Sequence, residues 1–419
     1  MRAATASETA STQERLQSAR RAAAEVGRLS TSRKNAILAV MAAEISRHRD
    51  RILAANAVDL AASNLNPSSR DRLLLTPARI AAMEEAISAV VALPDPVGEV
   101  LAAWTRPNGL RISKIRVPLG VVGIIYESRP NVTVDAVALC LKSGNAVVLR
   151  GGREAAETNE VLVKILQATP GLPAGAIQLL DSRSRQSAEE LMRARGLVDV
   201  LVPRGGAALI NRVVEEATVP VIETGAGNCH VYVDKKADLD MADQIVINAK
   251  TQRPSVCNAA EKLLIHQDIS QEYVPRIVAK LLACRVEVLG DEQTRSLAAG
   301  QGIGVAEEAD WYTEYLDLRM AIAVVPSLDA AMTHINHYST RHSDAIVTSD
   351  QARAQRFLDQ VDSAAVYWNA STRFTDGGEF GLGAEMGISN QKLHCRGPFG
   401  LPELTSTKYQ VIGTGQVRS

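Results

Sequence analysis

The alternation of short apolar runs and amphipathic segments after residue 120 constrains the fold of this 419-residue chain more than any other feature. Strands that alternate with helices at this spacing pair in parallel through right-handed crossovers. The alternation resumes between residues 263 and 368, so we predict an α/β chain with two doubly wound parallel-sheet domains. The predicted strands of the first domain are residues 121–126, 146–149, 176–180, 198–202 and 219–222.

The segments before and after this alternation have other periods. Residues 12–95 carry apolar side chains at three- and four-residue intervals, which predicts three or four packing helices. Residues 101–117 alternate on both sides of Pro107-Asn108-Gly109 and therefore predict a β-hairpin. Residues 405–412 can form a last strand. A hairpin between a helical segment and an α/β domain has open edges, which subunit contacts often cover.

The charge balance and the cysteines exclude several classes of protein. A formal net charge of −1 gives no field that attracts nucleic acid or an anionic membrane. Five separated cysteines without a CxxC pair argue against a disulfide framework or zinc ribbon and for a reducing compartment. His334, His337 and His342 lack the Cys or carboxylate pattern of a metal site, so we expect a polar helix surface and no metal. Without a signal peptide or membrane-spanning run, we expect a cytoplasmic protein.

One cysteine has the surroundings of a nucleophile. Cys257 follows Arg253 and Pro254, and proline fits the first turn of a helix. A thiol at a helix start would lie near unpaired N–H groups and the positive end of the helix dipole, which favour the thiolate. Alternatively, Cys257 is a small buried hydrophobic residue.

Two predicted strands end in the same way. Arg150-Gly151-Gly152 and Arg204-Gly205-Gly206 each lead from a strand into a helix. Exposed glycine N–H groups beside a guanidinium suit a phosphate, although neither stretch is the GxGxxG fingerprint. Each could instead be a tight turn that needs glycine for its dihedral angles. Glu223, at the end of the fifth predicted strand, is either a solvated charge or a positioned carboxylate.

Taken in order, these stretches resemble the aldehyde dehydrogenase superfamily and, within it, the gamma-glutamyl phosphate reductases (glutamate-5-semialdehyde dehydrogenases). The resemblance covers about residues 10–415. The stretches that carry it are Tyr126–Asn131, Leu149–Gly152, Val202–Gly206, Glu223–His230, Arg253–Glu261, Asn369–Thr375, Gly381–Gly387 and His394–Gly400.

The resemblance implies an aldehyde-dehydrogenase-like fold with a small β oligomerisation element. Residues 1–225 would be the cofactor domain, 226–370 the catalytic domain, and 371–419 a return to the cofactor domain ending in the oligomerisation strand. Hairpin 101–118 would complete that element in a homo-oligomer. The implied activity is NADPH-dependent reduction of L-glutamate 5-phosphate to L-glutamate 5-semialdehyde in proline biosynthesis. Contact with the glutamate kinase that supplies this labile substrate stays open.

The resemblance also assigns roles to single residues. Cys257 would be the nucleophile and form a thioester, and Glu223 matches the general base of the superfamily but could orient or protonate instead. Glu127–Asn131 departs from the Pro-Trp-Asn of the superfamily, which leaves Asn131 and the Cys257 N–H as oxyanion donors. Arg150 would lie beside the adenosine ribose, Gly205 and Gly206 at the pyrophosphate, and Glu314 at the nicotinamide ribose.

Charge decides the expected coenzyme and substrate contacts. Arg150, the N–H groups of Gly151 and Gly152, and Arg153 would surround the extra phosphate of NADPH, and no carboxylate intervenes to hold a bare ribose. The loop arginines Arg129, Arg253 and Arg373 would bind the anionic substrate, or else form surface or interdomain ion pairs.

Three other functions are compatible with parts of this pattern. A CoA-acylating aldehyde dehydrogenase would use the same cysteine with a thiol in place of phosphate. A Cys-His acyl hydrolase would need His230 or His266 as its base, but no spacing supports such a pair. A non-catalytic scaffold would need neither the cysteine nor the two Gly-Gly turns.

Overall fold

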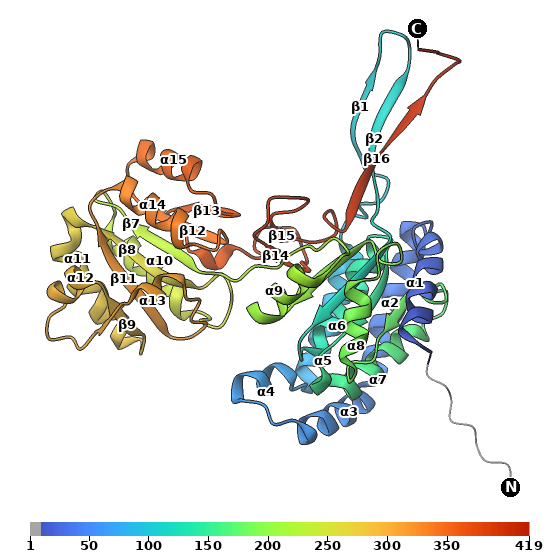
Figure 1. The fold of residues 1–419 in the computed structure, drawn as a ribbon, viewed down its shortest axis with the longest axis horizontal. Coiled ribbons are helices and arrows are strands. Elements are labelled where there is room, and N and C mark those ends of the chain that lie inside the picture. Colours follow the sequence, from blue (N-terminus) through green and yellow to red (C-terminus); the bar gives the residue numbers. More distant parts are fainter. Residues whose placement is uncertain (1–9, 419) are drawn as a thin grey trace. The chain divides into compact units, whose positions relative to one another are not determined.

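The computed structural model describes residues 10–418, and their contacts divide the chain into two compact units (Figure 1). The first unit contains the chain up to Glu223, Leu382–Gly387 and the chain from Phe399 onward. The second contains Thr224–Gly381 and Ile388–Pro398. The chain therefore passes from the first unit to the second directly after Glu223. Two short strands, β14 (Gly387–Ser389) and β15 (Gly397–Phe399), pair where the chain returns.

The first unit begins with helices whose starts are set by local capping. Ser11 caps the first helix in a capping box with Glu14, and Ser30 and Thr76 cap two later helices. Residues 12–92 form five helices, where the sequence predicted three or four. They are α1 (Thr12–Val26), α2 (Thr31–Arg47), α3 (Arg49–Ala62), α4 (Pro67–Leu73) and α5 (Pro77–Ala92).

A four-stranded parallel sheet forms the centre of the first unit, in the order β5-β4-β3-β6. Alternate side chains such as Val121 and Ile125 enter one apolar core with residues of α1 and α8, as period-two burial requires. The elements are β3 (Val121–Tyr126), α6 (Pro130–Lys142), β4 (Ala146–Arg150), the 3₁₀ turn η1 (Arg153–Ala155), α7 (Ala156–Gln167), β5 (Ile177–Leu179), α8 (Arg185–Met192), β6 (Val200–Arg204) and α9 (Ala207–Glu216).

The strand predicted at residues 219–222 was wrong. Only an isolated parallel bridge between Leu201 and Val221 forms there. Pro220 accepts a hydrogen bond from the Leu201 N–H through its carbonyl but has no N–H to donate, so the ladder cannot extend through it.

The second unit contains a seven-stranded parallel sheet in the order β10-β9-β11-β8-β7-β12-β13. Helices cover both faces: Val231 and Leu263 pack in one core with α10 and α11, whereas Tyr232 and Leu264 pack in another with α14. The elements are β7 (Cys229–Val233), α10 (Leu239–Thr251), β8 (Ala260–His266), α11 (Gln267–Ala283), β9 (Glu287–Gly290), α12 (Glu292–Leu297), β10 (Gly304–Val305), α13 (Glu308–Tyr312), β11 (Arg319–Val325), α14 (Leu328–Tyr338), β12 (Ser343–Val347), α15 (Gln351–Gln360), β13 (Ala365–Trp368) and η2 (Thr372–Phe374).

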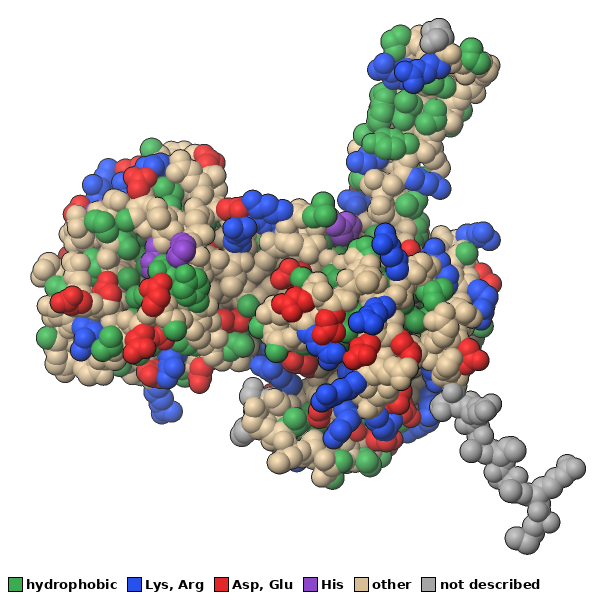
Figure 2. All heavy atoms as spheres, in the orientation of Figure 1, with side chains coloured by type: hydrophobic (Ala, Val, Ile, Leu, Met, Phe, Trp, Pro, Cys, Tyr) green, Lys and Arg blue, Asp and Glu red, His purple; other side chains and the backbone are tan. Residues whose placement is uncertain are grey.

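The predicted hairpin joins the C-terminal strand in a separate antiparallel sheet. β1 (Val100–Thr105) pairs with β2 (Arg111–Pro118), and β2 pairs along its whole length with β16 (Thr405–Ile412). Hydrophobic side chains gather on this sheet (Figure 2). The exposed large ones are Val100, Leu101, Trp104, Tyr409, Val411 and Ile412. No helix within residues 10–418 is long and apolar enough to span a bilayer.

A buried amide ties this antiparallel sheet to the first parallel sheet. The Asn145 Oδ1 accepts the Gly120 N–H at 2.8 Å, and its Nδ2 donates to the Leu404 carbonyl at 2.8 Å. Leu404 directly precedes β16, and Gly120 directly precedes β3. The side chain of Asn145 thus fixes the starts of two strands that are far apart in the sequence.

We therefore expect Asn145→Ala to lower the free energy of unfolding by about 2–4 kcal/mol, because one buried and one part-buried backbone group lose their partner. Thermal and urea denaturation followed by circular dichroism measure this loss. Asn336→Ala is the matched control, since that amide is exposed and water can replace its contacts. An equal, small effect of both substitutions would contradict the assignment.

Candidate active site

Cys257 lies in a turn directly before β8 and is partly exposed. The preceding helix α10 ends at Thr251, and residues 254–258 form turns and a bend. The predicted helix start at Pro254 was therefore wrong. Proline fixes the same φ angle for a turn as for a first helical position, so Pro254 alone could not distinguish them. A helix dipole does not account for a reactive thiolate at this position.

The backbone of Cys257 is fixed by the loop that precedes β7. An added Cβ at Gly227 would lie 1.4 Å from the Cys257 carbonyl oxygen, so only glycine fits. The Cys229 Sγ donates to the same carbonyl at 3.2 Å. Glu314 accepts the Gly227 N–H at 2.6 Å, and burial raises the pKa of this carboxyl. The structure thus brings the predicted residues Cys257 and Glu314 together through Gly227.

Two of the predicted arginines lie beside the Cys257 turn. The Arg373 Nε donates to the Gln252 side chain at 2.8 Å, and its guanidinium bonds to the Asn258 amide oxygen. The Asn258 Nδ2 in turn donates to the Thr375 carbonyl at 2.8 Å. Burial lowers the pKa of Arg373, and so does the nearby charge of Arg253. Arg253, Arg373 and Cys257 therefore form one cluster in the second unit.

In the first unit, Arg150 is half-buried at the end of β4. Its Nη2 donates to the carbonyls of Ser182 and Ser184, each at 3.2 Å, and burial lowers its pKa. Gly151 is buried and closely packed, since an added Cβ would lie 2.3 Å from the Asn159 amide nitrogen. Arg153 opens η1 and is exposed.

A carboxylate side chain of the protein itself occupies the second Gly-Gly turn. The Glu127 carboxylate accepts the Gly206 N–H at 2.9 Å, and an added Cβ at Gly205 would lie 2.6 Å from the Glu127 Cδ. Gly206 caps the N-terminus of α9, where a negative charge is favoured. The sequence did not predict this contact. The available signal was a carboxylate at the end of β3, since β3 and β6 are neighbouring parallel strands.

The remaining predicted residues also belong to the first unit. Asn131 donates its amide to Asp135 at 3.1 Å within α6, and burial raises the pKa of Asp135 to about 6. Arg129 precedes α6 and donates its backbone N–H to the Glu127 carbonyl at 2.7 Å. Glu223 is the last residue of the unit before the chain crosses to the second.

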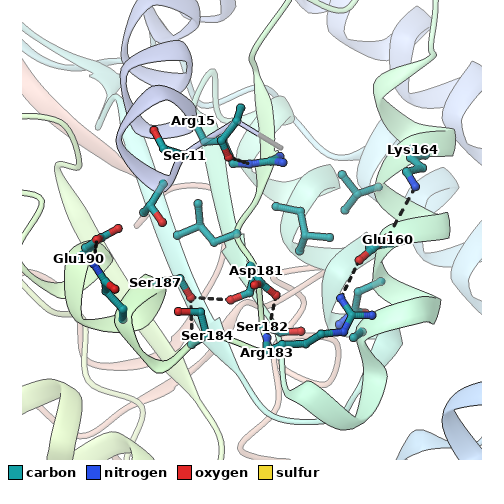
Figure 3. Close-up of a pocket in the computed structure, with 18 of the residues that line it drawn as sticks. Ser11, Arg15, Glu160, Lys164, Asp181, Ser182, Arg183, Ser184, Ser187 and Glu190 are labelled. Atoms are coloured by element: carbon teal, nitrogen blue, oxygen red, sulfur yellow. Dashed lines mark hydrogen bonds and ion pairs between the residues drawn. The ribbon is translucent and has the colours of Figure 1, made fainter. Parts of the chain in front are cut away.

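A hollow of about 610 Å³ opens between α1, α7 and the loop that follows β5 (Figure 3). Ser182, Ser184 and Arg183 line it. Arg183 pairs with Glu157 at 2.6 Å and with Glu160 at 3.0 Å. The sequence did not predict this hollow, although the polar run of residues 181–185 at the carboxyl end of a parallel strand was a usable signal.

Of the three histidines considered for a metal, His337 is exposed on α14 as expected, whereas the other two are not on the surface. His334 is half-buried between Trp311 and Tyr338, and burial lowers its pKa to about 3. His342 is completely buried. In the described part of the chain, no three His, Cys, Asp or Glu side chains are grouped so that they could hold a metal ion.

Comparison with known proteins identifies the family. The aldehyde dehydrogenase family matches residues 1–300. A gamma-glutamyl phosphate reductase of Koribacter versatilis is 67% identical over 97% of this chain and 100% of its own length. A gamma-glutamyl phosphate reductase of Thermobifida fusca is 57% identical over 96% of this chain and 97% of its own length. The crystal structure of the Thermotoga maritima enzyme is 46% identical, covers 97% of this chain and 100% of that one, and superposes with a TM-score of 0.95.

The chain belongs to the gamma-glutamyl phosphate reductase family. The match runs through both units, so the predicted aldehyde-dehydrogenase-like fold of parallel sheets is confirmed. Membership of this family and the aldehyde dehydrogenase match make the chain an oxidoreductase that acts on an aldehyde-level substrate.

The close approach of Gly227 to Cys257 predicts that a larger side chain at position 227 impairs catalysis. Gly227→Ala should lower kcat about 100-fold, because the methyl group displaces the Cys257 backbone and misplaced reacting groups lose rates of that order. Steady-state kinetics and thermal melts check this. Gly27→Ala is the control, since its backbone φ of −65° suits alanine and the nearest atom, the Ala23 carbonyl oxygen at 3.3 Å, needs to shift by only a few tenths of an ångström. A wild-type kcat for Gly227→Ala would contradict the assigned geometry.

Proposed function

We propose that this chain reduces L-glutamate 5-phosphate to L-glutamate 5-semialdehyde with release of phosphate, using Cys257 as the nucleophile and NADPH as the coenzyme. The observation that carries the proposal is the cluster of Cys257, Arg253 and Arg373. It combines a partly exposed thiol with two guanidinium groups, as an acyl phosphate requires. The names of the relatives support the same substrate class.

The covalent steps involve only the cysteine and the substrate. The Cys257 thiolate attacks the acyl carbon, the carbon–oxygen bond to phosphate breaks, and phosphate leaves with that electron pair. A thioester remains. When bound, NADPH supplies the hydride for the acyl group. Collapse of the resulting thiohemiacetal expels the thiolate, which regenerates Cys257 and frees the semialdehyde.

The arginines are assigned to the negative charges of the substrate. Arg253 and Arg373 would favour the thiolate and the leaving phosphate, and we assign Arg129 to the same anionic ligand. The oxyanion donors would be the Cys257 N–H and Asn131, whose amide must then give up Asp135. Glu223 would orient or protonate, because a water activated there would hydrolyse the thioester.

We assign the adenosine end of the dinucleotide to the first unit. The hollow beside β5 has the volume of a small-molecule site, with hydroxyl groups and backbone carbonyls in its lining. Arg150 donates to the backbone carbonyls of Ser182 and Ser184, two residues that line the hollow, and the nearby carboxylates of Asp181 and Glu154 act to raise its pKa. We assign Arg150, Gly151, Gly152 and Arg153 to the adenosine phosphate end.

The other end of the dinucleotide is assigned to three residues. Gly205 and Gly206 would hold the diphosphate, and Glu314 the nicotinamide ribose. The diphosphate would have to displace the Glu127 carboxylate from the Gly206 N–H.

We also propose that the sheet β1-β2-β16 makes the contact between subunits of a homo-oligomer. Its exposed Val, Leu, Ile, Trp and Tyr side chains form an apolar strip on an antiparallel sheet with two open edges.

The reaction can be run backwards with semialdehyde, phosphate and NADP⁺. Cys257→Ala should abolish turnover while leaving coenzyme binding and thermal stability unchanged, because no other group can form the thioester. Absorbance of the reduced coenzyme measures turnover, with and without phosphate. Cys284→Ala is the control, since that thiol is exposed and outside the cluster. Residual turnover by Cys257→Ala would exclude the covalent route, and turnover with CoA in place of phosphate would favour a CoA-acylating enzyme.

Coenzyme choice tests the assigned cations. Arg153→Glu should lower kcat/KM with NADPH about tenfold and leave NADH unaffected, because only NADPH carries the additional phosphate. Arg51→Glu makes the same charge change on the exposed side of α3 and should alter neither value. If the wild-type enzyme used both coenzymes equally, or if Arg153→Glu kept the original preference, the assignment would be wrong.

A further inference from the structure

Three fully buried charged side chains of the second unit take no part in the proposed chemistry. They are Lys250 on α10 and Glu261 and Lys262 on β8. The Lys250 Nζ lies 2.8 Å from one Glu261 carboxylate oxygen. Burying a charge is unfavourable unless it is paired and hydrogen-bonded, and an apolar pair would often serve stability equally well. This buried group therefore calls for an explanation beyond stability.

The two residues on β8 hold the backbone of the loop that carries Glu314. The Lys262 Nζ donates to the Thr313 carbonyl at 2.7 Å and lies 4.4 Å from the centre of the Tyr315 ring. The second carboxylate oxygen of Glu261 accepts the Leu316 N–H at 3.2 Å. The loop is thus held on both sides of Glu314.

The same loop contains a strained residue. Leu316 has a φ of 54°, in the left-handed region that residues with a Cβ rarely adopt. Such a conformation persists where neighbouring groups hold it in place, and it is common near functional sites. Here the hydrogen bond to Glu261 does so, and the loop directs the Glu314 carboxylate to the Gly227 N–H at 2.6 Å.

We propose that Lys262, supported by the Lys250–Glu261 pair, positions the carboxylate of Glu314. This inference rests on the proposed role of Glu314 at the coenzyme. Lys262 bonds to the backbone of Thr313 and is therefore a positioning residue. Burial lowers the pKa of Lys262 to about 7, and in its charged form Lys262, like Lys250, acts to lower the pKa of Glu314 against the effect of burial.

A double-mutant cycle separates positioning from mere structural support. Lys262→Met keeps the length of the side chain but removes the charge and the hydrogen bond to Thr313. We expect it to lower kcat/KM for NADP⁺ about tenfold in the wild-type background and to have no further effect when Glu314 is already alanine. The same fold-change in both backgrounds would overturn the proposal.

The single substitutions distinguish the proposed role of Glu314 at the coenzyme from the positioning role of Lys262. If Glu314→Ala leaves kcat/KM for NADP⁺ unchanged, the assigned role of Glu314 is wrong, and the positioning role falls with it. If Glu314→Ala lowers that value and Lys262→Met does not, only the positioning role is wrong. Lys142→Met is the matched control, because it removes a buried lysine of the first unit that bonds to Asn35 and the Val91 carbonyl. It should lower the melting temperature without changing kcat/KM for NADP⁺.

A second variant keeps the test decisive if Lys262→Met does not fold. Tyr315→Leu removes the ring beneath the Lys262 ammonium group and leaves the lysine in place. We expect a loss of about threefold in kcat/KM for NADP⁺, again absent in the Glu314→Ala background. An unchanged value for Tyr315→Leu, or an equal loss in both backgrounds, would overturn the proposal.

Discussion

The contact between the backbones of Gly227 and Cys257 sets the geometry of the second-unit site. No side chain larger than hydrogen fits at Gly227, because a Cβ would lie within bonding distance of the Cys257 oxygen. Both residues belong to loops that enter neighbouring strands, since β7 begins at Cys229 and β8 at Ala260. The parallel pairing of β7 and β8 therefore fixes the separation of the two loops. The packing of these two strands therefore determines the position of the proposed nucleophile.

The sequence predicted the helices and strands better than it predicted the edge of the sheet at which the candidate site lies. Apolar runs located both sheets, and residues 405–412 formed a strand within the predicted bounds. Strands as short as β9 and β10 cannot be recognised from periodicity, because so few residues do not define a period. Parallel sheets usually bind ligands at the carboxyl ends of their strands, but Cys257 precedes β8 and Glu314 precedes β11. Residue spacing could not reveal this, because the same loop length serves either end of a strand.

Predictions from single residues were ambiguous where two local conformations require the same amino acid. Pro254 suited a helix start and a turn equally, and the turn formed. Gly151 and Gly206 both followed a predicted strand, but one is closely packed against Asn159 and the other donates its N–H to Glu127. Only the neighbouring strands decide which outcome occurs. At Gly206, a hydrogen bond to a carboxylate, worth about 1.5–3 kcal/mol, would have to be exchanged for one to a diphosphate. With the diphosphate bound as proposed, the coenzyme and Glu127 would compete for the Gly206 N–H.

Without a helix dipole at Cys257, the positive charge of this site must come from side chains. Arg373 is held by Gln252 and Asn258, so its guanidinium does not need to be ordered when an anion binds. Arg253 lies close enough to lower the pKa of Arg373, which means that the two cations repel each other in the free protein. An anion between them relieves that repulsion, and a thiolate or a leaving phosphate is such an anion. One fixed guanidinium group and the exposed one of Arg253 would together stabilise both the attacking and the departing negative charge of the proposed acyl transfer, a role that one helix terminus could not fill alone.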